Sequence, residues 1–192
     1  LGAFSMDEKD LVAQAKDGDD GAFDLLVKLH HRNAYNLAYR FMADPGGADD
    51  VVQDSFVKAY KALKGFRGES SFKSWLLRIV ANTAKNALRS RARHSGSDLD
   101  SQPLAYIHED FGRLESGQRA KLLKEAVAKL APKQKMALEL RIFEELSFKE
   151  VASVMNCPFD TAKANFRHAL MNLRKIIQGD EFLKGELSHE DG

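Results

Sequence analysis

Cysteine, proline and glycine are all scarce in this sequence of 192 residues, which has one cysteine, four prolines and 13 glycines. The single Cys157 excludes a disulfide bond within the chain and fits a reducing compartment. With 44% hydrophobic and 30% charged residues, the composition is typical of a helix-rich globular protein rather than of a disordered or fibrous one.

Long apolar runs and common catalytic motifs are absent too. No stretch approaches the roughly 20 apolar residues of a transmembrane helix, and no signal peptide, basic and then apolar, opens the chain. Neither an HExxH zinc motif nor a Walker-type phosphate-binding loop occurs. We therefore expect a cytoplasmic protein that does not itself lie in the membrane, and the sequence predicts no metal and no cofactor.

Strand-like alternation is nearly absent, whereas apolar residues recur at three- and four-residue spacing, which predicts an all-α fold. One gap breaks this pattern: residues 94–118 are rich in Ser, Asp and Gly, a composition typical of linkers. The sequence thus predicts two small helical domains, 7–93 and 119–178, joined by a flexible acidic linker and followed by an acidic tail, 179–192.

The net charge of +1 hides an alternation along the chain. Residues 7–57 carry a net charge of −6 and residues 58–93 one of +9, while the second domain carries +6 and the linker and tail −4 each. Basic segments of this kind are typical of proteins that bind polyanions, but they also occur as merely solvated surface. The positions of the charges on helices must decide between these two interpretations.

Four helices are expected in the first domain: 10–16, 22–42, one that begins at Asp49 and Asp50, and 72–93. Acids suit a helix start because carboxylates interact favourably with its unsatisfied N–H groups and positive dipole end. Apolar residues of the third helix can face a core, which leaves Asp50, Gln53 and Asp54 on other faces. This helix therefore presents an acid-led outer surface.

The last helix of the first domain carries a polar stripe at i, i+4, i+7 and i+11: Arg78, Asn82, Lys85 and Arg89. Phe66 lies in the loop before this helix, and Trp75 lies in its first turn. Cations that bind phosphates beside aromatic rings that stack on bases are typical of single-stranded nucleic-acid sites. Phe66 and Trp75 are equally well explained as core residues, and both interpretations stay open.

A helix-turn-helix pattern lies in the second domain. Ser147 and Glu150 form a capping-box pattern that begins a short helix. Asn156 can adopt the left-handed conformation that ends a helix, and Pro158 prevents continuation. A tight turn therefore separates this helix from the next one.

Asp160 or Thr161 is expected to cap the second helix of this motif. Its outward residues are small, polar or basic: Thr161, Lys163, Ala164, Arg167 and His168. A helix-turn-helix inserts this end of its second helix into the major groove of DNA. A generic helical hairpin packs similarly and remains an alternative.

Two segments carry a resemblance to a known family. Residues 49–86, "DDVVQDSFVKAYKALKGFRGESSFKSWLLRIVANTAKN", resemble region 2 of bacterial sigma factors of the extracytoplasmic-function (ECF) class, which are sigma-E-like. Residues 130–175, "LAPKQKMALELRIFEELSFKEVASVMNCPFDTAKANFRHALMNLRK", resemble region 4 of the same class. The match covers nearly all of residues 9–178, and two unrelated motifs in the right order are far more specific than either alone.

The resemblance implies a factor that joins core RNA polymerase through the β′ and β subunits. Such a factor recognises the −10 and −35 elements of a promoter, helps to open the DNA, and serves a stress or envelope response. An anti-sigma factor is implied as a further partner. The protein would have no active site and no small-molecule substrate.

The resemblance also assigns roles to single residues. The surface that meets the β′ coiled coil corresponds to Asp50, Gln53 and Asp54. The region that captures a flipped −10 base corresponds to Phe66, Arg67, Gly68 and Asn82. The residues that hold phosphates near the −10 element are Lys73, Arg78, Lys85 and Arg89. The face that reads the −35 element corresponds to Thr161, Lys163, Asn165, Arg167 and His168.

The −35 face departs from the commonest family pattern. Many members have Ser-Arg where this sequence has Ala164-Asn165, and another Arg where it has Leu170. Fewer cations therefore reach the groove, so the −35 contacts are either weaker and more amide-based or differ in sequence preference.

Two rival functions fit parts of the sequence. A helix-turn-helix regulator that binds DNA without joining polymerase leaves the acid-led helix without a purpose. A metal-dependent nuclease or phosphotransfer enzyme could use Asp49, Asp50, Asp54 and Glu69, but consecutive helix residues point about 100° apart and rarely converge on one metal. A redox role for Cys157 is a weaker hypothesis, because a position beside Pro158 in a turn favours burial.

Overall fold

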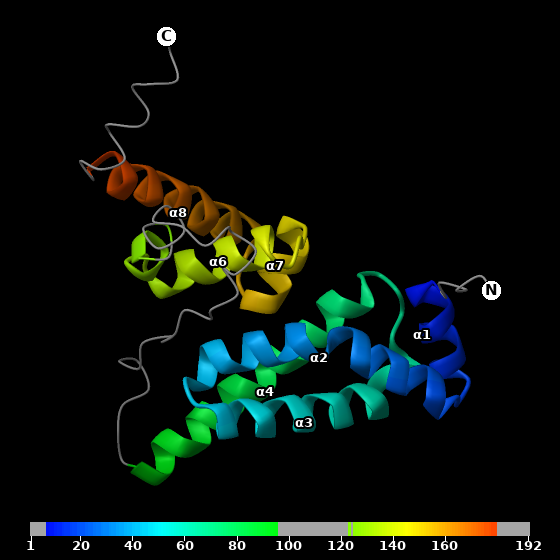
Figure 1. Ribbon diagram of the computed structural model, residues 1–192. Helices are drawn as coiled ribbons and strands as arrows, with labels where there is room; N and C mark the ends of the chain where they lie inside the picture. Colours follow the sequence, from blue (N-terminus) through cyan, green and yellow to red (C-terminus); the bar gives the residue numbers. More distant parts are fainter. Residues whose placement is uncertain (1–6, 96–122, 124, 180–192) are drawn as a thin grey trace, which may run out of the picture. The chain divides into compact units, whose positions relative to one another are not determined.

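The computed structural model describes residues 7–95, 123 and 125–179 (Figure 1). The chain divides into two compact units, 1–105 and 106–192, and each is described by itself. The described residues form helices and no strands, which confirms the all-α prediction. Almost all of the predicted linker and tail lies outside the described residues.

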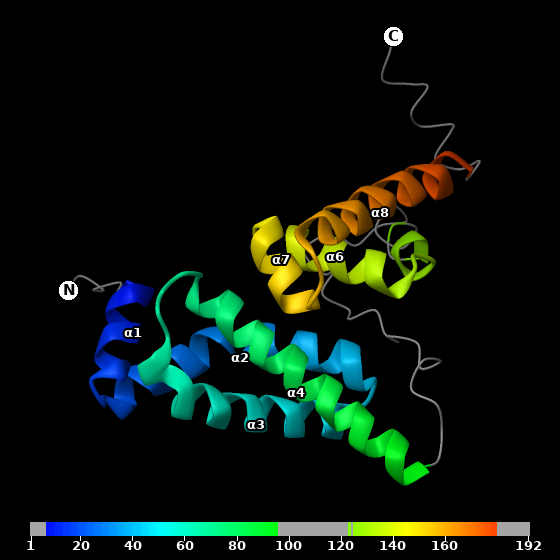
Figure 2. The ribbon, with the colours of Figure 1, turned by 180° about the vertical axis from the view of Figure 1, so that it is seen from behind.

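Four α-helices and one 3₁₀ turn make up the described part of the first unit: α1 (Glu8–Lys16), α2 (Asp20–Met42), α3 (Pro45–Ala62), η1 (Leu63–Gly65) and α4 (Phe72–Ser95). Helices α2, α3 and α4 pack side by side, as seen from both sides in Figures 1 and 2. Their shared core contains the fully buried Leu26, Leu37 and Leu76.

Helix α1 packs on the first half of α2. Its Glu8 carboxylate lies 3.0 Å from Nε2 of His30, a buried residue of α2. The His30 ring in turn lies 5.5 Å, centroid to centroid, from Phe72 at the start of α4. Three helices therefore meet at His30, and α1 is held beside the loop that leads into α4.

Helix α3 begins four residues earlier than the sequence predicts. Its first residue is Pro45, and the Asp44 side chain caps it by accepting a hydrogen bond from the Gly47 N–H. Proline is well tolerated at the first helical position because its missing N–H would have no partner there. The Pro-Gly-Gly break is therefore the first turn of the helix, and the prediction that Asp49 and Asp50 begin it was wrong.

Gly47 lies close to the end of the Arg91 side chain. A Cβ atom at this position would lie 2.5 Å from Nη2 of Arg91, near the end of α4. The Arg91 Nη1 donates to Asp44 Oδ2 at 2.8 Å. This hydrogen bond and that of Gly47 hold the pKa of Asp44 below its ordinary value. The start of α3 is thus tied to the end of α4.

The second unit contains α6 (Pro132–Ile142), α7 (Phe148–Met155) and α8 (Phe159–Gly179), preceded by a helical stretch at 125–128. One hydrophobic core cluster lies between that stretch, α6 and α8. The buried members are Ala126, Val127, Leu130, Leu138, Ala169 and Leu173. Helix α7 packs against both α6 and α8.

The helix-turn-helix forms as its local signals predict. The Ser147 N–H donates to Glu150 Oε2 at 2.9 Å, and the Glu150 N–H donates to Ser147 Oγ at 3.4 Å, so the capping box is present. Asn156 ends α7 in the left-handed region with φ of 54°. Helix α8 begins at Phe159, and the Ala162 N–H donates to the Pro158 carbonyl at 3.1 Å. The cap position is therefore Pro158, and the prediction that Asp160 or Thr161 caps the helix was wrong by two or three residues.

Candidate functional site

The acid-led surface of α3 is exposed. Asp50, Gln53 and Asp54 all face solvent, while the opposite side of the helix packs into the core. Their i, i+3, i+4 spacing places them along one strip. Val57, three residues after Asp54, continues the strip and is 48% exposed.

Sequence reasoning missed Val57 as part of this surface. A β-branched residue at position i+7 from Asp50 was the available signal, because it returns to the same helical face. Protein interfaces commonly have an apolar centre and a polar rim. An exposed Val57 among three polar residues fits that arrangement.

Lys58 connects this helix to α4. Its Nζ lies 4.0 Å from the Asp54 carboxylate and donates to Thr83 Oγ1 on α4 at 3.2 Å. Thr83 is buried. Lys58, on the exposed side of α3, therefore also contacts α4, the helix that carries the polar stripe.

The polar stripe of α4 is largely solvent-exposed. Arg78, Asn82 and Arg89 face solvent, whereas Lys85 and Lys73 are half-buried. The Lys85 ammonium lies 5.9 Å from the centre of the Phe41 ring. Arg78, Asn82 and Arg89 are therefore the most accessible members of the predicted −10 set on this helix.

Phe66 is a core residue. Its ring is 8% exposed, with its centroid 5.0 Å from that of Trp75 and 6.2 Å from that of Phe72. The three rings pack against one another where the loop returns to α4. This burial favours a structural role for the Phe66 ring, and its assignment as a −10 contact stays a prediction.

The residues that follow Phe66 are exposed. Arg67 Nη1 lies 3.8 Å from Glu69 Oε1. Gly68, between these two residues, has a φ of +71°, a conformation that favours glycine. Ser71 ends the loop by accepting the Ser74 N–H at 3.1 Å, which caps α4.

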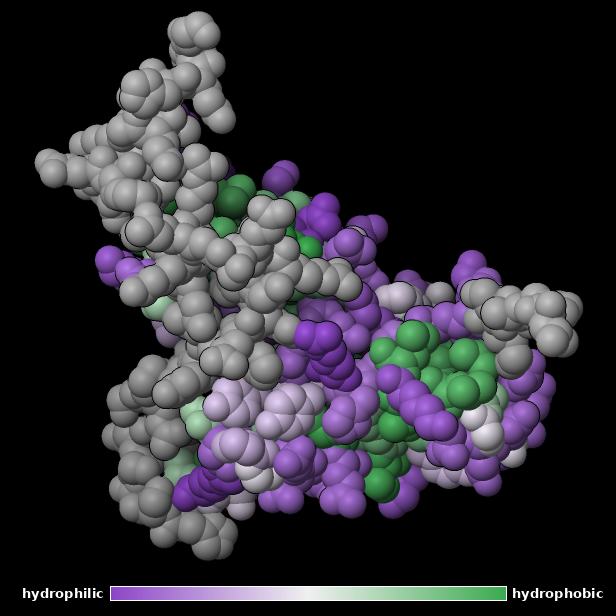
Figure 3. Space-filling model, viewed as in Figure 1, coloured by the Kyte–Doolittle hydropathy of each residue, from purple (hydrophilic) through white to green (hydrophobic). Residues whose placement is uncertain are grey.

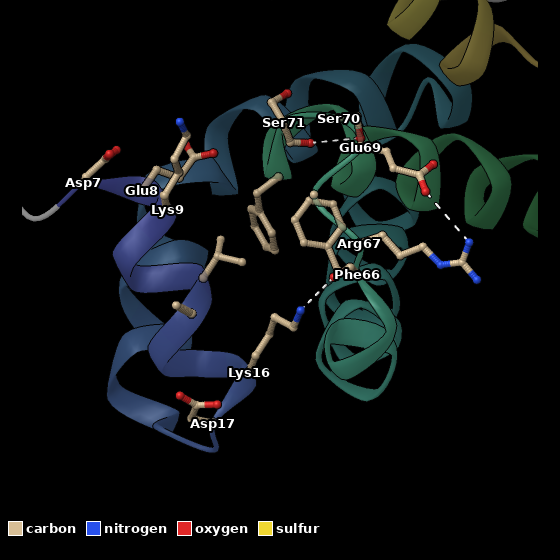
Figure 4. A pocket seen from close by; sticks show the side chains of 14 residues that line it. Asp7, Glu8, Lys9, Lys16, Asp17, Phe66, Arg67, Glu69, Ser70 and Ser71 are labelled. Atoms are coloured by element: carbon tan, nitrogen blue, oxygen red, sulfur yellow. Dashed lines mark hydrogen bonds and ion pairs between the residues drawn. The ribbon is translucent and has the colours of Figure 1, made fainter.

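A cleft of about 880 Å³ separates this loop from α1. Figure 4 shows Lys9 and Lys16 on the α1 side and Arg67 and Glu69 on the loop side. Its lining combines apolar side chains, Phe66 among them, with charged ones of both signs. The cleft is therefore a concave, mixed surface beside the predicted −10 loop.

Four of the five residues of the predicted −35 set lie on the exposed face of α8, and the −35 role of the set stays a prediction. Thr161, Lys163, Arg167 and His168 are exposed. Asn165 is half-buried, and its Nδ2 donates to the main-chain carbonyl of Thr161 at 2.9 Å. The Asn165 amide nitrogen is thus turned back onto its own helix.

Phe159 is a surface residue that sequence reasoning missed. It is the first residue of α8 and is 45% exposed, with its ring edge-on to Phe148 at 6.4 Å between centroids. Apolar side chains at this end of a recognition helix can contact thymine methyl groups. An aromatic directly after the helix-stopping Pro158 was the available signal.

Two properties concern the described residues alone. Within residues 7–95, 123 and 125–179, no group of three or more His, Cys, Asp or Glu side chains is arranged to hold a metal ion. In the same part of the chain, no helix combines the length and apolar character needed to cross a membrane.

Comparison with known proteins identifies the family. The sigma-70 region 2 model matches residues 26–94, and the sigma-70 region 4 model matches residues 120–173. The RNA polymerase sigma-H factor of Pseudomonas aeruginosa is 38% identical over 181 residues, which cover 89% of this chain and 94% of the relative. The chain belongs to the ECF class of sigma factors.

Other relatives agree with this ECF sigma factor assignment. The ECF RNA polymerase sigma-E factor of Salmonella typhimurium is 34% identical over 178 residues, 88% of this chain and 93% of the relative. Two solved structures share the fold with TM-scores of 0.61 and 24% identity. These are CnrH in complex with the cytosolic domain of CnrY, over 91% of this chain and 99% of that one, and RpoE with NepR from Bartonella quintana, over 83% and 98%.

The sigma factor therefore binds core RNA polymerase and directs promoter recognition at transcription initiation. Sigma factors are initiation factors and not enzymes. A regulator that never joins polymerase is not favoured, because both the region 2 and the region 4 families match in the expected order. Helix α1 precedes the region 2 match, which begins at residue 26.

Proposed function

We propose that the exposed strip of α3 is the surface on which this sigma factor meets core polymerase. The observation that carries this assignment is the strip itself: Asp50, Gln53 and Asp54 lie around an exposed Val57. An acidic rim steers association with a basic partner helix, and an apolar centre supplies buried area. The partner is the β′ coiled coil, as the family resemblance implies, with further contacts to β.

We propose that the −10 element is bound as a single strand by the loop after Phe66 and by the stripe of α4. The exposed Arg67, Arg78 and Arg89 supply cations for phosphates, and Asn82 supplies an amide for a base edge. Lys73 and Lys85 are half-buried and support the same surface from its margin. The burial of Phe66 favours a structural role for its ring, beneath the loop.

We infer that α8 reads the −35 element in the major groove. Thr161, Lys163, Arg167 and His168 form the reading face, and Phe159 adds an apolar group at its start. The Asn165 bond to the Thr161 carbonyl favours a reduced role for this amide as a donor to bases. Only two of these groups, Lys163 and Arg167, are lysine or arginine, which supports modest −35 affinity.

We further infer that an anti-sigma factor controls this protein. The Bartonella quintana relative of the same fold was solved with the anti-sigma factor NepR. The first unit carries an apolar surface area over the first half of α2 in Figure 3, where Leu25 and Leu29 are 46% and 53% exposed. A factor that binds promoter DNA is expected to act in the cytoplasm, where the bacterial chromosome lies. A stress or envelope response stays a prediction.

A reconstituted transcription assay with bacterial core polymerase tests these assignments. Asp54→Arg reverses a charge in the α3 strip, and we expect core affinity to fall about tenfold or more. Asp24→Arg makes the same change at an exposed position of α2 outside the strip and serves as the control. Equal core affinity of the two variants would show that the strip is not the docking surface.

The −10 assignment is tested in the same assay. Asn82→Ala is expected to join core polymerase normally but to open promoters poorly, because its amide is proposed to contact a base. Asn86→Ala, an exposed asparagine one turn along α4 and outside the proposed set, is the control. Normal opening by Asn82→Ala would remove this residue from the −10 surface.

A further inference from the structure

Lys16 is the last residue of α1, and its side chain reaches the loop that precedes α4. The Nζ donates a hydrogen bond to the main-chain carbonyl of Phe66 at 2.9 Å, across 50 positions of sequence. Figure 4 shows this bond at the edge of the cleft between α1 and the loop. Hydrogen bonds from an ammonium group are stronger than those between neutral groups.

The loop has a fixed start and an exposed tip. At its start, the Phe66 N–H donates to the Leu63 carbonyl at 3.0 Å, and the Phe66 ring packs against Phe72 and Trp75. Arg67, Gly68 and Glu69 then face solvent. The anchoring therefore ends at the peptide group that joins Phe66 to Arg67.

The Lys16 bond acts on that peptide group. The Phe66 carbonyl and the Arg67 N–H belong to one planar unit, so a bond that fixes the carbonyl also fixes the direction in which the chain enters the tip. The Phe66 ring by itself leaves this plane free to rotate about the preceding single bond. Lys16 thus supplies a constraint on this peptide group that comes from α1.

We propose that Lys16 is a positioning residue for recognition of the −10 strand. It holds the Phe66 peptide so that residues 67–70 are ordered before single-stranded promoter DNA binds. Ordering a loop in advance raises affinity because less conformational entropy is lost on binding. This inference rests on the proposed −10 function of the loop, and it assigns a role to α1, which lies outside the region 2 match.

Three substitutions in the full chain test the proposal. Lys16→Met keeps most of the side-chain length and removes the donor, whereas Lys16→Arg keeps a donor. Lys9→Met is the matched control, since Lys9 is an exposed lysine of the same helix that lines the same cleft. The probe is a fluorescent oligonucleotide with the non-template −10 strand of a promoter that the wild type transcribes in the reconstituted assay.

We expect Lys16→Met to weaken binding of this strand about fivefold, the scale of ordering one or two side chains. Lys16→Arg and Lys9→Met should stay within about twofold of the wild type. Core polymerase affinity should be unchanged in all three, because the α3 strip does not include these residues.

The salt dependence separates positioning from direct contact with DNA. A lysine that contacts a phosphate of a single strand contributes about 0.7 to the slope of log K against log salt. Lys16→Met should leave this slope unchanged. A slope reduced by about 0.7 would identify Lys16 as a phosphate contact and overturn the proposal.

A measurement without DNA completes the test. In Lys16→Met, amide hydrogen exchange should become faster at residues 67–70, and exchange of the α3 amides should remain unchanged. The fluorescence of Trp75, the one tryptophan of the chain, should change because the loop beside it is less ordered. Wild-type binding and exchange in Lys16→Met would overturn this inference alone. A wild type that binds no −10 strand would overturn the proposed −10 function and this inference with it.

Discussion

In the second unit, the signals that present the α8 surface lie within a few residues of one another, whereas in the first unit the contacts join helices far apart in the sequence. Ser147, Glu150 and Asn156 define α7 and its end by local hydrogen bonds. In the first unit, the loop after Phe66 and the start of α3 depend on long-range pairs, Lys16 with Phe66 and Asp44 with Arg91. A local motif is readable from the sequence, and a surface assembled across a bundle is not.

The largest expected effect comes from the core of the first unit. Leu76 is fully buried, so Leu76→Ala should lower the free energy of unfolding of this unit by about 2–5 kcal/mol. Trp75 fluorescence measures this unit selectively, because the chain has no other tryptophan. Leu25→Ala, at an exposed leucine of the same unit, should change it by less than about 0.5 kcal/mol. Equal losses would contradict the described core.

The capping box of the second unit is expected to contribute less. Ser147→Ala removes the side-chain oxygen that accepts the Glu150 N–H, which should cost about 1 kcal/mol. Hydrogen exchange of the α7 amides measures the loss, and Trp75 fluorescence should show none. Ser153→Ala inside the same helix is the control, and alanine there should be neutral or stabilising. An effect of Ser147→Ala on the first unit would break the contrast between local and long-range organisation.

The proposed −35 surface of α8 can be tested by adding a basic residue to it. Asn165→Arg introduces the basic residue that the family resemblance implies at this position. It should raise affinity for a −35 duplex and steepen the salt slope by about 0.9, the value of one phosphate contact on duplex DNA. Gln178→Arg adds the same charge near the other end of α8 as a control. A steeper slope for both variants would indicate a general charge effect instead of a contact in the groove.

The smallest effect is expected from the pair that joins α3 to α4. The Arg91 hydrogen bond lowers the pKa of Asp44, so the stabilisation is fully present above the unfolded value near 3.9 and is lost as pH falls through the folded pKa. Asp44→Asn keeps a good capping residue but removes this dependence. Because the pair is partly exposed, its contribution should be under about 1 kcal/mol.

Unfolding monitored by Trp75 fluorescence between pH 7 and pH 3 tests this prediction. The stability difference between the wild type and Asp44→Asn should shrink toward the acid end. Asp24→Asn, at an exposed carboxylate of α2, controls for the loss of one negative charge. A difference that grows as pH falls would contradict the lowered pKa.

Sequence patterns were sufficient for most elements and for the exposed members of the site. The stripe of Arg78, Asn82 and Arg89 and the reading face of α8 follow from helical spacing, which depends on the backbone geometry of neighbouring residues. Helix starts were less predictable. A proline followed by two glycines can either break a helix or begin one. Here the Asp44 cap makes Pro45 the first residue of α3.

By itself, the sequence determined the all-α class and the helix-turn-helix, because these depend on interactions between residues three or four positions apart. The two sigma-factor regions were recognised in the sequence by their resemblance to a known family. Only the tertiary structure decided that the Phe66 ring is buried, that Val57 and Phe159 are exposed, and that Lys16 bonds the Phe66 carbonyl. Burial and long-range hydrogen bonds depend on which helices pack together. The spacing of residues along one helix does not specify which other helix packs against it.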